Sequence, residues 1–312
     1  MAHPIQTRCL AFGPEAVALA ARLIADGQPV AVPTETVYGL AADAGDGAAV
    51  ARIYEAKGRP SFNPLIVHVP DLGAAEALGV FDAGARALAA AFWPGPLTLV
   101  VPRRAGAAIA SLATAGLATI ALRVPAHRAM RALLAASGRP LAAPSANASG
   151  RISPTRAAHV LASLDGRIPL VLDDGPTPAG LESTIVLTGE APRLLRPGPI
   201  AAEAIEAVLG APLGQAPGGI IAPGQLASHY APAKKLRLNA LESRADEWLI
   251  GFGAVAGDDS LSPAGDLAEA AARLFDCLHR ADASARARIA VAPVPGEGLG
   301  AAINDRLARA AH

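Results

Sequence analysis

The chain has 312 residues, which at roughly 150 residues per domain is enough for about two domains. Its 27 Lys and Arg residues balance 27 Asp and Glu residues, so no overall field would draw the chain to nucleic acid or to an anionic membrane. Hydrophobic residues make up 52% and charged residues 17%, and this balance excludes long disordered regions because enough apolar surface can be buried. We therefore expect a folded protein that binds any anion through local groups.

The sequence has no strong signal for a membrane, for secretion or for disulfide bonds. Residues 105–122 form a long uncharged stretch, but their Ser, Thr and Gly side chains indicate core rather than a membrane span. The first residues carry no apolar segment behind a basic start, so we expect no secretory signal and a cytoplasmic location. Cys9 and Cys277 belong to no metal-ligand motif, and we expect both to be reduced thiols.

Helical and strand patterns alternate along the first two thirds of the chain. A helix is predicted over residues 14–26 with Gly27 as its stop, and Asp46 and Gly58 are expected to cap a second helix. Short apolar runs predict strands over residues 29–32, 65–69, 97–101, 119–124, 169–172 and 183–187. Strands separated by helices favour an α/β fold, and the short spacing within residues 183–196 favours some antiparallel pairing. We expect a twisted mixed sheet with flanking helices.

The pattern breaks at residues 210–233, where Gly and Pro are frequent and predict a linker. Beyond it we expect strands over residues 234–240, 247–253 and 288–294, and helices over residues 263–280 and 300–311. These elements make a small Rossmann-like α/β domain. We therefore divide the chain into residues 1–209, a linker at 210–233 and a second domain at 234–312.

Polar residues gather first in the sequence PTETVYGL, residues 33–40, directly after a predicted strand. The ends of strands in open α/β sheets are where ligands bind, because the loops diverge there and leave backbone N–H groups free. A turn whose Thr hydroxyls satisfy nearby backbone groups accounts for the segment equally well.

A second polar group is AKGRPSFNPLIVH, residues 56–68. Lys57 is the only lysine before Lys234, and together with Arg59 and Asn63 it could present charges and an amide to phosphate oxygens. The alternative is that the two basic residues only complement the dipole at a helix C-terminus. His68 lies within an apolar strand, where a lone histidine is more often a core residue than a catalyst.

A third polar group, residues 141–155, follows the same pattern, with Ser145 and Ser153 in a loop of small residues whose backbone could approach a ligand. An ordinary polar crossover loop is the alternative. Further polar side chains at strand ends are Arg123, Glu182, Ser183 and Arg196. Each of these signals is weak alone, but together they predict one polar cleft.

Several familiar site types are excluded by missing motifs. The sequence contains no G-x-x-x-x-G-K-[ST], H-E-x-x-H, C-x-x-C or G-x-S-x-G, which removes P-loop nucleotide hydrolysis, zinc hydrolysis and the serine triad of α/β-hydrolases. GEGLG at residues 296–300 lacks the last glycine of a dinucleotide fingerprint and has no downstream acidic residue on a second strand, so we expect a tight turn there.

Five segments resemble one known family when they are taken together. They are PTETVYGLA, KGRPSFNPL, APSANASG, STIV and LLRPG, and they lie within residues 24–199. Their order and spacing are similar to those of the YrdC family of L-threonylcarbamoyladenylate synthases. The linker APGQLASHYAP and the terminal GLGAAINDRLARAA further resemble the longer, two-domain members. Ala222 departs from that pattern, since Ser is expected before Pro-Gly.

The resemblance implies a YrdC-like fold and an enzyme that joins L-threonine, bicarbonate or CO2, and ATP into threonylcarbamoyladenylate and pyrophosphate. A separate transferase would then deliver the threonylcarbamoyl group to tRNA, so tRNA binding here is expected to be weak or transient. Mg2+ is expected to be carried with ATP, with no dedicated protein metal site.

The resemblance also assigns roles to individual residues. Threonine would be held by Thr36, His68, Arg123, the backbone of Ala143, and Ser183. ATP would be held by Arg59, Asn63, Thr119, Ser145, Ser153, Arg196 and, from the linker, Tyr230. Lys57 would lie near the phosphates and share the catalytic role with Arg59, and no general base can be named.

The linker is expected to act as a lid. Residues 220–232 contain Gln225, His229 and Tyr230, which are unusual in a passive spacer, and they could fold over the loaded cleft to exclude water. The alternative is that Tyr230 only packs between the domains.

Two other functions stay open at this point. One is an RNA-binding module whose cleft grips a phosphate backbone. The other is a different nucleotide-dependent carbamoyl transferase of the same fold, although the extra zinc-finger segments of that class are absent here.

Overall fold

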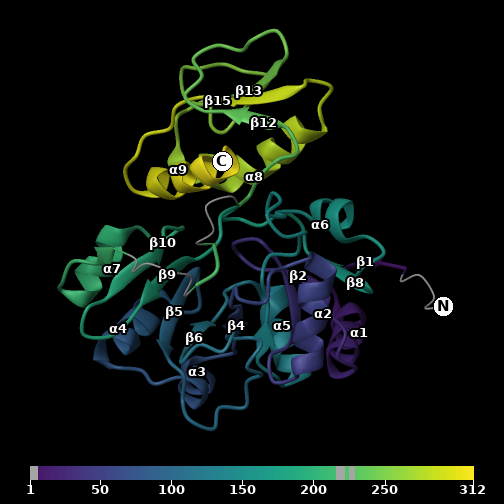
Figure 1. Cartoon of the computed structure of the whole chain (residues 1–312), viewed down its shortest axis with the longest axis vertical. Coiled ribbons are helices and arrows are strands. Elements are labelled where there is room, and N and C mark those ends of the chain that lie inside the picture. The colour runs from purple at the N-terminus through teal and green to yellow at the C-terminus, as the bar shows by residue number, and fades with distance from the viewer. Residues whose placement is uncertain (1–5, 216–221, 225–228) are drawn as a thin grey trace.

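The structure is a computed structural model that describes residues 6–215, 222–224 and 229–312. Figure 1 shows a larger body that carries the N-terminus and a smaller body, above it, that carries the C-terminus. The strands of the larger body are β1 (Arg8–Ala11), β2 (Val30–Pro33), β3 (Tyr38–Asp43), β4 (Ile66–His68), β5 (Leu97–Pro102), β6 (Thr119–Arg123), β7 (Leu141–Ala142), β8 (Leu170–Asp173), β9 (Thr184–Leu187), β10 (Arg193–Arg196) and β11 (Gly214–Gln215). Within the described residues they form one mixed 11-stranded sheet, in the order β1-β8-β2-β3-β7-β4-β6-β5-β9-β10-β11.

Helices cover both faces of this sheet. They are α1 (Pro14–Ala25), α2 (Gly47–Lys57), α3 (Leu72–Leu78), α4 (Ala83–Phe92), α5 (Arg128–Ser137), α6 (Ala157–Leu164) and α7 (Ala202–Leu209). Successive side chains of a strand point to opposite faces. Accordingly, Val30 and Val32 of β2 pack with α1 and α5, whereas Ala31 packs in the core on the other face, with α2, α4 and α6. Each face therefore has its own buried core.

The two predicted N-terminal helices are confirmed, and their caps explain where they end. The carboxylate of Asp46 accepts a hydrogen bond from the backbone N–H of Ala48 at 2.8 Å, which satisfies one of the free donors at the start of α2. Gly58 ends α2 with φ 60°, a left-handed conformation that glycine adopts without strain. Each predicted strand of this sheet is present within about two residues.

Strands β1, β3, β7, β10, β11 and β14 (Asp259–Ser260) were not predicted as strands, and the absence of a signal for β3 and β1 has a clear reason. The sequence predicted a loop over residues 33–40. In the structure the chain turns back there, and β3 pairs with β2 in antiparallel register, with Val32 opposite Gly39. The sequence YGLAAD contains no β-branched residue, so it lacks the usual strand signal. β1 is an edge strand whose residues are mostly exposed, and it therefore shows no apolar run.

The smaller body is a parallel sheet with two helices beside it. Its strands are β12 (Lys235–Arg237), β13 (Glu247–Gly251), β14 (Asp259–Ser260) and β15 (Arg288–Val291), and its helices are α8 (Leu267–Ala283) and α9 (Leu299–Ala310). The strands lie in the order β12-β15-β13-β14. In Figure 1, α8 and α9 lie on the side that faces the larger body. The predicted α/β class, with a mixed sheet and a small C-terminal α/β domain, is confirmed.

Two predictions about single segments are also resolved. Residues 296–300 form a tight turn in which Gly298 has φ 54°, and a Cβ on Gly300 would lie 1.9 Å from a backbone oxygen of Pro295. Residues 105–118, which were expected in the core, instead form a loop whose side chains are mostly exposed or half-buried. Among the described residues, no helix is long and apolar enough to cross a membrane.

Candidate active site

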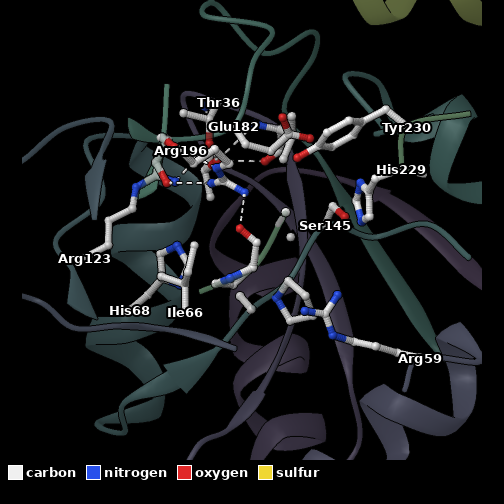
Figure 2. A pocket seen from close by; sticks show the side chains of 18 residues that line it. Thr36, Arg59, Ile66, His68, Arg123, Ser145, Glu182, Arg196, His229 and Tyr230 are labelled. Atoms are coloured by element: carbon white, nitrogen blue, oxygen red, sulfur yellow. Dashed lines mark hydrogen bonds between the residues drawn. The ribbon is translucent and has the colours of Figure 1, made fainter. Parts of the chain in front are cut away.

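A partly open cavity lies where several strands of the large sheet end and the chain returns from the linker, as Figure 2 shows. The volume of the cavity itself is about 50 Å3. The lining consists of Thr34, Thr36, Val37, Gly39, Arg59, Ile66, His68, Arg123, Ala143, Pro144, Ser145, Glu182, Ser183, Arg196, Pro223, Gly224, His229 and Tyr230. We call the part around Arg123, Thr36 and His68 the Arg123 end, and the part around Tyr230, His229 and Glu182 the Tyr230 end.

The structure brings most of the predicted site residues to this cavity. Those in the lining are Thr36, Arg59, His68, Arg123, Ala143, Ser145, Ser183, Arg196 and Tyr230. The other predicted residues, Lys57, Asn63, Thr119 and Ser153, do not belong to the lining that the described residues form.

Arg123 ends β6 and is fixed from three sides. Its Nη1 donates to Thr36 Oγ1 at 3.0 Å and its Nε to Gly95 O at 3.2 Å. Its Nη2 lies 2.7 Å from Glu35 Oε1 in a buried ion pair. The guanidinium is therefore preorganised at the cavity wall, where it can grip a carboxylate.

Glu35 was not predicted, although it stands in the PTETVYGL segment. Its Oε2 accepts hydrogen bonds from the backbone N–H groups of Ala126 and His127, just before α5 begins. Burial raises the pKa of Glu35, but attraction to Arg123 and their hydrogen bond outweigh burial and leave that pKa below its ordinary value. Glu35 is thus an anion that holds Arg123 in place.

His68 extends from β4 into the cavity, although its sequence context alone favoured a core residue. The side chain is 2% exposed, and neither ring nitrogen has a hydrogen-bond partner. Burial, and then the positive charge of Arg123, lower the pKa of His68 to about 3. The imidazole is therefore neutral near pH 7, and its ring nitrogens can donate a hydrogen bond to a ligand hydroxyl or accept one from it.

Ser183 and Arg196 connect the two ends of the cavity. Arg196 Nε donates to Ser183 O and Nη2 to Ser183 Oγ, both at 3.1 Å. The hydroxyl of Thr98 lies 2.7 Å from Ser183 Oγ. Burial lowers the pKa of Arg196, whose guanidinium nevertheless adds positive charge to the lining.

Arg59 and Lys57 have different positions, although the sequence suggested one shared role. Arg59 belongs to the lining and donates from Nη2 to Pro64 O at 3.0 Å. Lys57 points elsewhere, since its Nζ donates to Ser145 O at 2.6 Å and Asn147 O at 2.5 Å. Lys57 therefore ties the end of α2 to the loop after β7, and its ammonium group is used within the protein rather than presented to a ligand.

The remaining predicted ATP-binding residues lie away from the lining for identifiable reasons. Thr119 starts β6 and Arg123 ends it, which separates them by about 13 Å at 3.3 Å per residue. The hydroxyl of Ser153 donates a hydrogen bond to Glu182 Oε1. Asn63 is fully buried, with both amide atoms unpartnered, outside the lining.

The Tyr230 end is formed by segments that are far apart in the sequence. Tyr230 is buried, its hydroxyl has no hydrogen-bond partner, and its φ of 63° is left-handed. Such a conformation costs a bulky residue about 1–3 kcal/mol and persists only where its surroundings hold it. The centroid of its ring lies 4.1 Å from that of His229 and 5.6 Å from that of Phe275 in α8. The small domain therefore helps to hold this side chain at the cavity.

Sequence reasoning also missed Arg306, which contacts Glu182 from α9. It stands in the quoted GLGAAINDRLARAA segment, but nothing in that segment distinguishes it from Arg309, which is only half-buried.

Comparison with known proteins gives matches along the whole chain. Residues 22–198 match the family model Sua5_yciO_yrdC, described as "Telomere recombination", and residues 200–312 match the model "Threonylcarbamoyl-AMP synthase, C-terminal domain". The second model begins before α7, whose Ile205 packs in a core of the large sheet, so this division differs from the predicted boundary at residue 209.

Individual relatives agree with these models. The chain is 42% identical to "Threonylcarbamoyl-AMP synthase" of Bacillus subtilis, over 95% of this chain and 92% of that one. It matches the crystal structure of Pyrococcus abyssi Sua5 complexed with L-threonine with a TM-score of 0.89 and 37% identity, covering 98% and 97% of the two chains. Full-length HypF is 18% identical with a TM-score of 0.52, covers 60% of this chain and 30% of its own, and shares the fold alone.

Proposed function

This chain belongs to the Sua5, YciO and YrdC family, and we propose that it is a threonylcarbamoyl-AMP synthase that uses the cavity described above. Its substrates are L-threonine, bicarbonate or CO2, and ATP, and its products are threonylcarbamoyl-AMP and pyrophosphate. The similarity to synthases of this name along nearly the full chain supports the assignment. Threonine is supported further by the P. abyssi Sua5 structure that holds it.

The observation that carries the proposal is that one cavity gathers positively charged side chains and buried polar atoms without hydrogen-bond partners. The Arg123 end offers a guanidinium that Glu35 holds in place and the neutral imidazole of His68, whose two nitrogens have no hydrogen-bond partner. A buried polar atom without a partner costs free energy, so these atoms fit a ligand that pairs with them. Threonine supplies a carboxylate for Arg123 and a hydroxyl for His68. Arg59 and Arg196 supply positive charge toward the Tyr230 end, which suits a nucleoside triphosphate.

The reaction can be written with these groups. The amine nitrogen of threonine bonds to the carbon of CO2 and loses a proton to solvent, which yields a carbamate; with bicarbonate as the carbon source, a water molecule leaves instead. One carbamate oxygen then attacks the α-phosphorus of ATP, and the bond to the bridging oxygen of pyrophosphate breaks. The residues of the chain would hold the carbamate in line with the α-phosphorus and stabilise charge on the phosphates, which are the two main tasks in phosphoryl transfer.

Mg2+ would enter this site with the phosphates of ATP. Among the described residues no group of three His, Cys, Asp or Glu side chains could hold a metal ion. Glu182 is the carboxylate in the lining, and it already accepts from Ser153 and Arg306. Mg2+ commonly keeps waters and binds substrate phosphates, so this donor set fits a metal that ATP carries.

The lid that we expect over the cavity, residues 220–232, lies partly outside the described residues. Residues 220–221 and 225–228 belong to the part that is not described, Gln225 among them, whereas His229 and Tyr230 lie in the lining. Their position supports a linker that contacts the nucleotide. Limited proteolysis with and without ATP and threonine tests the lid, and cleavage unaffected by both ligands would leave residues 210–233 as a tether.

The proposed product implies the chain's place in the cell. A mixed carboxylic–phosphoric anhydride is labile, so a transferase that delivers the threonylcarbamoyl group to tRNA must consume it. The cytoplasm is the compartment we propose, because ATP, threonine and tRNA are available there.

Pyrophosphate release by the purified protein, with each substrate omitted in turn, tests the function. We expect release only when threonine, bicarbonate and ATP are all present. ATP consumption at the full rate without threonine would contradict the proposal. RNA affinity that falls steeply with salt, without any turnover, would favour the RNA-binding module instead.

A further inference from the structure

Arg306 on α9 is a fully buried arginine that reaches from the small domain to the cavity wall. Its Nε donates to Glu182 Oε2 at 2.8 Å, and its Nη2 donates to Pro197 O at 3.0 Å. Its guanidinium carbon lies 5.1 Å from the ring centroid of Tyr230, on the ring's face. Asp305, the preceding residue, accepts from Nη1 at 2.6 Å.

These contacts connect three segments that border the cavity. Glu182 and Tyr230 are lining residues, and Pro197 directly follows Arg196, which is a third. The segments belong to the loop before β9, the end of β10 and the last part of the linker. Figure 2 shows Glu182, Arg196 and Tyr230 along the upper edge of the cavity, with Thr36 beside Glu182.

Only an arginine can make this set of contacts at once. The guanidinium is planar, and its donors point outward in fixed directions while its face stacks on an aromatic ring. A lysine ammonium would keep the charge but could not donate to Glu182 and Pro197 while covering the ring of Tyr230. The left-handed backbone of Tyr230 adds to the need for such support, because its surroundings must hold it.

We propose that Arg306 is a positioning residue, through which the C-terminal domain fixes Glu182 and Tyr230 at the nucleotide-binding side of the cavity. This inference rests on the proposed function, because it takes the Tyr230 end to be where ATP binds. The Arg123 end does not depend on Arg306, since Glu35, Thr36 and Gly95 hold Arg123. Loss of Arg306 should therefore weaken nucleotide binding and leave threonine binding unchanged.

Calorimetry on the full chain with Arg306→Lys tests this separation. The probes are a non-hydrolysable ATP analogue with Mg2+ and, separately, L-threonine. We expect the Kd of the analogue to rise by about tenfold or more, and the Kd of threonine to stay within about twofold. Arg288→Lys is the matched control, because Arg288 lies in the same domain in an ion pair with Asp246 and is exposed. An unchanged Kd for the analogue, or equal losses for both ligands, would overturn the proposal.

A double-mutant cycle separates positioning from general stability. If Arg306 acts through Tyr230, Arg306→Lys should cause little further loss of analogue affinity in a Tyr230→Ala background. Fully additive losses would overturn that route. Should Arg306→Lys fail to fold, Arg306→Gln, which keeps one donor for Glu182 without a charge, is measured in the same way. If the unmodified chain releases no pyrophosphate, the proposed function is contradicted. The role of Arg306 can still be judged in that case, because the calorimetry measures binding and needs no turnover.

Discussion

The two ends of the cavity are built in different ways. The Arg123 end is completed within the large sheet, where Glu35 and Thr36 fix Arg123 through contacts among residues 34–127. The Tyr230 end combines Glu182, from the loop before β9, with Tyr230 of the linker and Arg306 of α9. One end is therefore a product of a single domain, and the other requires two. A change at the first end should affect threonine alone, whereas a change at the second should affect the nucleotide.

Arg123→Ala should give the largest effect and sharpen this contrast. It removes the carboxylate grip and leaves the buried Glu35 without its cation, and such losses cost about 2–5 kcal/mol. Calorimetry should show that threonine affinity falls by this amount while ATP affinity is retained, with a lower melting temperature. Arg128→Ala is the control, since Arg128 is close by but exposed in an ion pair with Asp174. Unchanged threonine affinity would remove Arg123 from its role.

Arg59→Met and Lys57→Met should differ, although both residues are basic and lie two positions apart. Arg59→Met should lower nucleotide affinity by about 1.5–3 kcal/mol, because a charged hydrogen bond to phosphate is lost. Lys57→Met should mainly lower the melting temperature, because the carbonyl groups of Ser145 and Asn147 lose their donor. The nucleotide affinity of both variants is measured well below the melting temperature of the less stable one. An equal loss of nucleotide affinity in both would place Lys57 at the phosphates.

His68→Gln should change how stability depends on pH. The pKa of His68 is about 3 in the folded chain, below its ordinary value of 6.5, so only the unfolded chain is protonated between these values. The free energy of unfolding therefore falls as pH is lowered from about 6.5 to 3, by about 1.4 kcal/mol per pH unit for one such proton. Chemical denaturation across this range should show a shallower slope for His68→Gln. An identical slope would mean that His68 is protonated in the folded chain.

Tyr230→Phe should give the smallest effect. The hydroxyl has no partner in the described residues, so removing it should leave the melting temperature unchanged or higher. If the hydroxyl binds the nucleotide, the KM for ATP should rise by the equivalent of about 0.5–1.5 kcal/mol, with the KM for threonine unchanged. Steady-state kinetics with each substrate varied in turn measures the split. A change in the threonine KM alone would reverse our assignment of the two ends.

The difference between the ends also explains which parts could be predicted from sequence. The predicted helices and most strands follow from local patterns, and the polar loops at strand ends converge on one cavity as expected. Glu35 could have been found, since it lies within a motif that was already singled out. Thr119 was expected at the cavity, but it lies at the start of β6, whereas the cavity is at the end of that strand. The local sequence does not indicate which end of a strand borders the site.

Arg306 could not have been found in this way. Its contact with Glu182 joins residues 124 positions apart, and no local pattern encodes where a helix of one domain meets a loop of another. Lys57 is a related case, because a basic residue at a helix end has the same sequence signature whether it binds phosphate or two carbonyl oxygens.

Direct detection of the product is the measurement that tests the account most directly. The purified chain would be incubated with isotopically labelled bicarbonate, L-threonine and Mg·ATP, and the nucleotide fraction analysed at once by mass spectrometry. We expect one new adenylate that contains both threonine and the labelled carbon, formed together with pyrophosphate. An adenylate of threonine without the labelled carbon, or no adenylate while ATP is consumed, would contradict the synthesis of threonylcarbamoyl-AMP in this cavity.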